Sequence, residues 1–149
     1  MKRFLTLLML PLFFACNPED LNILNQGEDD ILKYIEENDL DATKTSTGLY
    51  YVVHEQGDGE PIGSNATVTV AYKGYFLNGV VFDKSSSDGI TFNLNKVIPG
   101  WTEGIAYFNE GGKGMLIIPP SLGYGAAGTQ KIPGGAVLVF DIEILKTTS

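Results

Sequence analysis

The segment from Ala136 to Leu145 is the feature that most restricts how this chain can fold. Every even position in it is apolar, whereas the odd positions include Asp141 and Glu143. Successive side chains of a β-strand point to opposite faces, so this period of two predicts a strand with one buried face. Phe140 is expected on that face. The pattern is typical of an antiparallel sheet that covers a core on one side.

A second segment, from Thr67 to Phe76, alternates in the same way. One of its faces carries Val68, Val70 and Tyr72. The pair Asn78-Gly79 follows directly and is the strongest short signal for a β-hairpin. Shorter strands are expected at 49–53, 80–83, 91–94 and 115–118. Eighteen glycines and seven prolines indicate the many turns of an antiparallel β protein.

One short helix is expected after these strands. Pro99 and Gly100 mark a turn, and Trp101, Ile105 and Phe108 then have the spacing of one helix face. The only tryptophan therefore stands in the first turn of this helix, where its ring can form the floor of an apolar pocket. The predicted fold class is α+β, with a strongly bent antiparallel sheet and one short helix across its concave side.

Residues 1–16 are interpreted as a bacterial lipoprotein signal peptide. Lys2 and Arg3 precede an apolar run over 4–15, which is too short to span a bilayer as a helix. The run ends at Cys16, the only cysteine and the expected site of lipidation. The alternative is a plain signal peptide with an incidental cysteine. The lipoprotein interpretation places the protein outside the cytoplasm, anchored by lipid to the cell envelope, with the outer membrane favoured.

Residues 17–46 are expected to form a linker with a short helix over 28–38. Acidic residues fill its first turn, where the helix dipole favours them. Its apolar stripe consists of Ile31, Leu32 and Ile35. A helix this short must lean on something, and we interpret it as a spacer that caps the folded domain. A dimerising helix is the alternative; because the stripe is so short, we expect a monomer.

Composition excludes several classes of function. The net charge is −8, and no basic cluster exists beyond Lys2 and Arg3, which argues against binding nucleic acid through its phosphates. Removal of 1–16 would leave a net charge of −10, so the protein would not bind an anionic membrane surface through charge. One histidine and one cysteine make a zinc site improbable. Common hydrolase and nucleotide-binding motifs are absent, and no cofactor is expected.

An aromatic pocket is the remaining candidate site. Its expected rings are Tyr72, Phe82, Trp101, Tyr124 and Phe140. Its expected aliphatic residues are Val97, Ile98 and Ile132. Each ring alone is more often ordinary core, but Tyr124 stands in a glycine-rich loop over 122–135 that cannot itself form a core. The nearest carboxylates, Asp83 and Glu103, lie on different elements, so no acid–base pair is predicted.

These residues carry a resemblance to the FKBP-type peptidyl-prolyl isomerase family. The matching motifs, in order, are Tyr72-Lys73-Gly74, Phe82-Asp83, Val97-Ile98-Pro99-Gly100-Trp101, Tyr124-Gly125 and Leu138-Val139-Phe140-Asp141. The resemblance covers residues 47–149, which we take as the isomerase domain. It implies a half-barrel wrapped on one helix, cis/trans isomerisation of Xaa-Pro bonds, and an apolar cleft able to bind macrolides of the tacrolimus and rapamycin type.

The resemblance also implies roles for individual residues. Trp101 would be the platform for the proline ring, and Asp83 would lie beside the carbonyl that rotates. The backbone N–H of Ile98 and the hydroxyl of Tyr124 would donate hydrogen bonds to ligand carbonyls. The residues implied to act in catalysis are Tyr72, Phe82, Asp83, Trp101, Tyr124 and Phe140. Those implied to shape substrate binding are Ile90, Val97, Ile98 and Ile132.

Three functions remain open from the sequence. The first is an isomerase that helps proline-containing polypeptide clients to fold. The second is a lipid-anchored chaperone or peptide-binding module with the same cleft and little turnover. The third is a lipoprotein scaffold with an incidental barrel. The joint presence of Asp83, Phe82, Trp101, Tyr124 and Phe140 favours the enzyme, because a protein that only binds peptides needs fewer defined groups.

Overall fold

The computed structural model describes residues 23–148, and the predicted signal peptide with Cys16 lies outside them. The helices are α2 (Glu28–Glu37) and α3 (Pro99–Ile105), with short 3₁₀ turns η1 (Leu94–Lys96) and η2 (Pro120–Leu122). The strands are β1 (Thr43–Lys44), β2 (Tyr50–Glu55), β3 (Thr67–Phe76), β4 (Val81–Lys84), β5 (Ile90–Asn93), β6 (Lys113–Ile118) and β7 (Leu138–Thr148).

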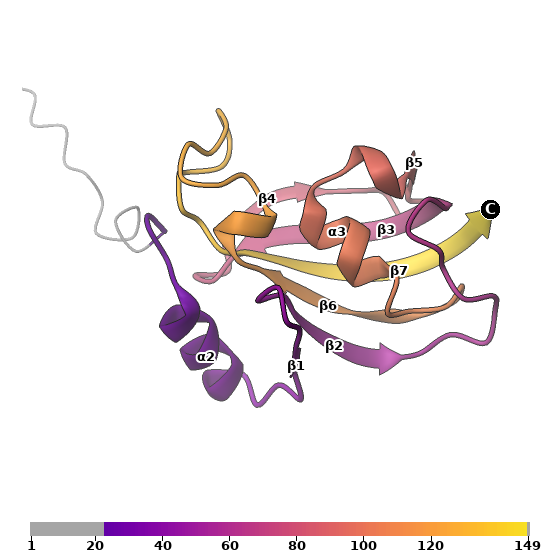
Figure 1. The fold of residues 1–149 in the computed structure, drawn as a ribbon, viewed down its shortest axis with the longest axis horizontal. Helices are drawn as coiled ribbons and strands as arrows, with labels where there is room; N and C mark the ends of the chain where they lie inside the picture. The colour runs from indigo at the N-terminus through magenta and orange to yellow at the C-terminus, as the bar shows by residue number, and fades with distance from the viewer. Residues whose placement is uncertain (1–22, 149) are drawn as a thin grey trace, which may run out of the picture.

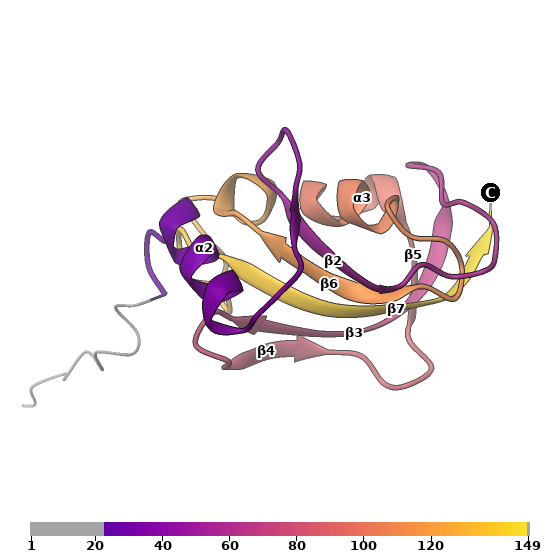
Figure 2. The ribbon, with the colours of Figure 1, turned by 90° about the horizontal axis from the view of Figure 1, so that it is seen from below.

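These strands form one antiparallel sheet in the order β1-β2-β6-β7-β3-β4, with β5 also paired to β3. The long strand β3 pairs with β7 along its whole length, while β5 and β4 follow one another along its other edge. Figures 1 and 2 show that the sheet bends strongly and that α3 lies in its concavity. The predicted fold class is confirmed.

The concave core is built where α3 rests on the sheet. Trp101, Ile105 and Phe108 are buried there. Phe108 was expected on the helix face, but α3 ends at Ile105 and Phe108 lies three residues beyond it. Gly100 and Gly104 permit the close approach: a Cβ at either position would lie 2.6 Å from a side chain of β6. The absence of two methyl groups therefore sets how near the tryptophan lies to the strands.

The opposite face of the sheet is buried as well, which the alternation of 136–145 did not predict. Val139 on β7 is fully buried, although it occupies an odd position. It belongs to a second cluster in which Ile31 of α2 packs on β2, β6 and β7. The prediction of one buried face was therefore incomplete, because α2 supplies a cover that comes from another part of the chain.

The apolar stripe predicted for α2 was partly wrong. Ile31 is 1% exposed and Ile35 packs beside it, but Leu32 is 47% exposed and lies outside the buried face. Adjacent helical residues point about 100° apart, so Ile31 and Leu32 cannot both face the sheet squarely.

The described part of the predicted linker, residues 23–46, lies against the domain. Ile23 is buried in the concave core. The backbone N–H groups of Asn25 and Gln26 donate to the carbonyls of Gly134 and Gly135, and β1 pairs with β2 at the sheet edge. Within residues 23–148 no helix has the length and apolar character needed to cross a membrane.

The packing of α2 predicts a clear difference between two neighbouring substitutions. Ile31→Ala should lower the free energy of unfolding by about 2–5 kcal/mol, because it leaves a cavity under the helix. Leu32→Ala removes an equal number of carbons from an exposed position and should change it by about 0.5 kcal/mol or less. Urea unfolding measures both. Equal effects would show that α2 does not pack on the sheet through Ile31.

Candidate active site

A cavity of about 520 Å³ lies between α3, the strands β3, β4 and β5, and the loop after η2. Nine of the ten predicted site residues line it: Tyr72, Phe82, Asp83, Ile90, Val97, Ile98, Trp101, Tyr124 and Phe140. They come from six separate parts of the chain. The fold therefore brings the predicted residues into one shared space.

The cavity is built around the indole of Trp101, which is 6% exposed. The rings of Tyr72 and Phe140 meet it nearly at right angles, with centroid distances of 5.0 and 5.1 Å. Phe82 in turn meets Phe140 edge-on at 5.5 Å. Edge-to-face pairs at these distances are favourable and fix the rings relative to one another. The result is an apolar hollow with rigid walls.

The indole N–H of Trp101 is buried and has no hydrogen-bond partner within residues 23–148. Leaving such a donor unpaired costs about 1–3 kcal/mol. Most buried donors in proteins are paired, so an exception calls for an explanation. The ring neighbours of the indole are Tyr72, Phe92 and Phe140, so its contacts in the cavity wall are mainly aromatic.

Tyr72 and Asp83 form the polar pair of the cavity. The Tyr72 hydroxyl donates to Oδ2 of Asp83 over 2.7 Å, between β3 and β4. Burial, followed by the hydrogen bond and the charge of Asp83, raises the pKa of Tyr72 to about 12. The phenol therefore stays protonated at neutral pH and remains a donor. This bond holds the carboxylate beside the aromatic walls.

Tyr124 reaches the cavity from a loop that the rest of the fold holds in place. Its side chain is 41% exposed, and its hydroxyl donates no hydrogen bond to residues 23–148. The loop closes on itself through the N–H of Gly128, which donates to the Tyr124 carbonyl, and through that of Gly135, which donates to Gly125. Residues 23–27 hold the C-terminal end of the loop through backbone hydrogen bonds to Gly134 and Gly135. A firmly held loop thus presents an available phenol.

The structure separates Ile132 from the other predicted site residues. Its side chain is 5% exposed and packs in the concave core, and it does not line the cavity. The turn at 129–132 places it inward: the hydroxyl oxygen of Thr129 accepts from the N–H of Ile132. Ile132 therefore packs the loop onto the concave core.

The cavity lining includes two further residues that were not predicted from the sequence. Phe92 lies on β5 and approaches Trp101 with a ring distance of 5.1 Å, and Lys96 follows on η1. Phe92 could have been found, since it is two residues from Ile90 and shares its face of the strand. No local pattern marks Lys96.

The cavity offers apolar contact and a few hydrogen-bonding groups. Within residues 23–148 no three histidine, cysteine or acidic side chains gather as a metal site would require. Its polar groups are the carboxylate of Asp83, the hydroxyls of Tyr72 and Tyr124, the amine of Lys96 and the backbone at the start of α3. Fold and cavity together define a half-barrel protein with an aromatic pocket suited to a compact apolar ring.

Comparison with known proteins identifies the family. The chain belongs to the FKBP-type peptidyl-prolyl cis-trans isomerases, whose family model matches residues 59–145. A curated relative from Buchnera aphidicola, the FKBP-type isomerase FkpA, is 50% identical over 107 residues, covering 70% of this chain and 42% of the relative. The chain spans about two fifths of the length of this relative and of FkpA from Escherichia coli, which is also 50% identical.

Solved structures share the fold. FkpA from Escherichia coli superposes with a TM-score of 0.72 at 42% identity, covering 80% of this chain and 60% of that one. A peptidyl-prolyl cis-trans isomerase from Pseudomonas syringae also gives 0.72, at 28% identity, covering 82% and 92%. Family and fold thus agree with the resemblance carried by the motifs.

The Tyr72–Asp83 pair predicts an unusual titration. Tyr72 should titrate near pH 12 rather than near 10, and in Asp83→Asn its pKa should fall but stay above 10, because burial is the largest cause of the shift. The stabilisation linked to this raised pKa is fully present below pH 10 and is lost as the pH rises through 12.

The measurement is the ¹³Cζ chemical shift of labelled tyrosine, with Tyr72→Phe to assign the signal. Asp88→Asn, which removes a charge from the adjoining exposed loop, is the matched control and should leave the midpoint in place. A Tyr72 midpoint near 10 in the parent protein would contradict the assignment of burial and the Asp83 bond.

Proposed function

We propose that this chain is a peptidyl-prolyl cis-trans isomerase that acts on Xaa-Pro bonds of polypeptide clients. The observation that carries the proposal is the cavity itself: a tryptophan floor, edge-on aromatic walls, and a carboxylate and a phenol at the rim. A proline ring is compact and apolar, so it suits this floor. Family membership supports the same activity.

The reaction needs no bond to be broken, only a lower barrier to rotation. Resonance holds the peptide bond planar with a barrier of about 18–20 kcal/mol. Uncatalysed isomerisation takes tens to hundreds of seconds. Reaching milliseconds requires a gain of about 10⁴–10⁵, or about 5.5–7 kcal/mol. The twisted amide has lost resonance and part of its charge separation, so a water-poor aromatic hollow favours it over the planar form.

Each residue of the cavity then has a role in that rotation. The proline ring lies on Trp101, while the N–H of Ile98 and the hydroxyl of Tyr124 hold flanking carbonyls. Asp83, tied to Tyr72, lies beside the carbonyl that rotates. The remaining walls are Phe82, Ile90, Val97 and Phe140. The same cleft would accept macrolides of the tacrolimus and rapamycin type.

Cellular placement is a separate part of the proposal. The lipoprotein signal inferred over 1–16 supports a protein outside the cytoplasm, attached through lipid on Cys16 to the cell envelope, with the outer membrane favoured. Its clients are then proline-containing polypeptides that fold there. The short stripe of α2 supports a monomer.

Turnover should depend on the two polar groups at the rim. Asp83→Ala and Tyr124→Phe should each lower kcat/KM at least about tenfold, because each removes a hydrogen bond or charge that acts on the rotating amide. A protease-coupled assay on a proline tetrapeptide measures this. Circular dichroism checks that the fold is retained.

Matched controls are available at residues that do not line the cavity. Asp88→Asn and Tyr34→Phe make comparable changes on the β4–β5 loop and on α2, and should keep full activity. Unchanged turnover in both rim variants would overturn the assigned roles. Peptide binding without turnover by the parent protein would favour the alternative, a chaperone or peptide-binding module.

Membrane attachment should depend on the thiol of Cys16. Cys16→Ser should move the protein from the membrane fraction to the soluble fraction, because it removes the acceptor for lipid while keeping the size of the side chain. Fractionation with labelled palmitate measures both attachment and modification. Continued membrane association of the variant would refute lipidation as the anchor.

A further inference from the structure

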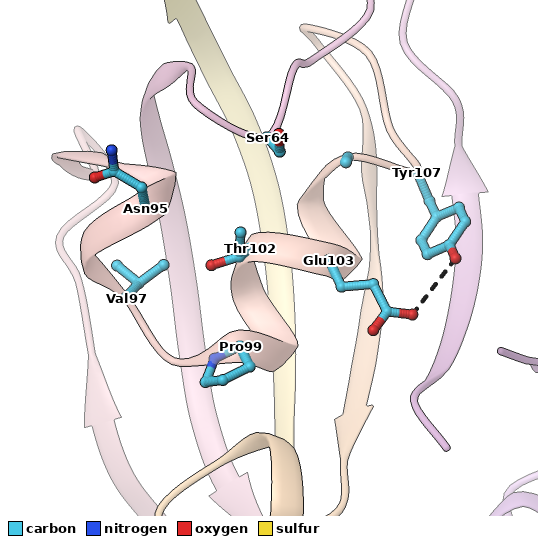
Figure 3. A pocket seen from close by; sticks show the side chains of 8 residues that line it. Ser64, Asn95, Val97, Pro99, Thr102, Glu103 and Tyr107 are labelled. Atoms are coloured by element: carbon cyan, nitrogen blue, oxygen red, sulfur yellow. Dashed lines mark hydrogen bonds between the residues drawn. The ribbon is translucent and has the colours of Figure 1, made fainter. Parts of the chain in front are cut away.

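A second concavity lies on the outer side of α3, facing away from the sheet. It has a volume of about 740 Å³, and its lining includes Ser64, Val97, Pro99, Thr102, Glu103 and Tyr107. Figure 3 shows Pro99, Thr102 and Glu103 on the helix, with Ser64 and Val97 on neighbouring segments and Tyr107 beyond the helix end. We call it the outer groove. It takes no part in the isomerase chemistry described above.

The outer groove borders the aromatic cavity. Val97 lines both, so the two hollows lie on either side of one side chain. Pro99 to Glu103 covers about 6 Å of helix, and an extended peptide advances about 3.3 Å per residue. That length takes about two residues of an extended client chain, and crossing Val97 from the proline takes about one or two more. Glu103 is therefore expected about three or four residues from the proline.

Glu103 is the charged group of the outer groove, and its carboxylate can accept more hydrogen bonds than it does. Its Oε2 accepts from the Thr47 hydroxyl at 2.6 Å and its Oε1 from the Tyr107 hydroxyl at 3.5 Å. A carboxylate can accept about four hydrogen bonds. The ion pairs found among residues 23–148 do not include Glu103, so its negative charge has no cationic partner there.

Tyr107 adds an aromatic surface beside that carboxylate. It stacks on Tyr51 with a ring distance of 4.3 Å and an interplanar angle of 5°, and it remains 38% exposed. The stacking holds the ring in place. A fixed ring next to a carboxylate without a cationic partner suits a guanidinium. Such a group can donate two N–H hydrogen bonds to the carboxylate and stack on the ring.

We propose that the outer groove binds the client segment next to the isomerised proline and selects a basic side chain, arginine above lysine, about three or four residues away. The inference rests on the proposed function, because the aromatic cavity fixes the position of the proline. It adds a charge preference that the aromatic cavity alone does not supply. Glu103 and Tyr107 are then specificity-determining residues.

The test compares peptides that carry arginine or its uncharged analogue citrulline three or four residues before or after a single proline. With the full chain, kcat/KM should be about threefold to tenfold higher for arginine on one side of the proline, the size expected for one exposed ion pair with a cation–π contact. The preference should shrink in 0.5 M salt. In Glu103→Gln the arginine-to-citrulline ratio should fall to about one.

The control is Glu36→Gln, which removes the same charge from an exposed position on α2 and should keep the ratio. The ratio of dissociation constants, read by calorimetry, gives a second measure that does not need turnover. If the chain binds these peptides without isomerising them, the proposed activity fails while the groove is still tested. Equal values for arginine and citrulline in every register, or a ratio that survives Glu103→Gln, would overturn the outer groove as a basic-residue site.

Discussion

The close contact between α3 and strand β6 is the constraint on which the site depends. Gly100 and Gly104 lie over β6 with no room for a methyl group, so the helix is held at a fixed and short distance from the sheet. That distance places the indole of Trp101 against Tyr72 of β3 and Phe140 of β7. A helix only slightly farther away would open the floor of the cavity to water. The burial of the tryptophan that floors the cavity follows from this packing.

The sheet is buried on both faces, and this ties the N-terminal part of the chain to the site. α2 covers the face opposite the cavity, so the curved strands are supported from behind. Just before it, residues 23–27 lie along the loop that carries Tyr124, with Gln26 also accepting from the N–H of Val137 through its side-chain oxygen. Residues 23–27 thus contact the segment that frames one side of the cavity.

Local sequence patterns predicted most of the fold because they report local physics. Alternation gave β3 with its observed bounds, and Asn78-Gly79 gave the hairpin, where Gly79 has a positive φ of 86°. The final strand was predicted two residues early and ends three residues later than expected. The errors arise where distant segments decide burial. Leu32 was assigned to a stripe that does not face the sheet, and Ile132 to a cavity that it supports from below.

By itself, the sequence determined which strands form apart from β1, where the short helix begins, and which rings and carboxylate could share a site, since periodicity, turn residues and linked motifs are properties of neighbouring positions. Only the tertiary structure decided that Phe92 and Lys96 join the cavity, that Val139 is buried under α2, and that Glu103 faces a separate groove. The reason is physical. Burial and contact depend on which surfaces the bent sheet brings together, and side chains far apart in the chain meet there without leaving a local signal.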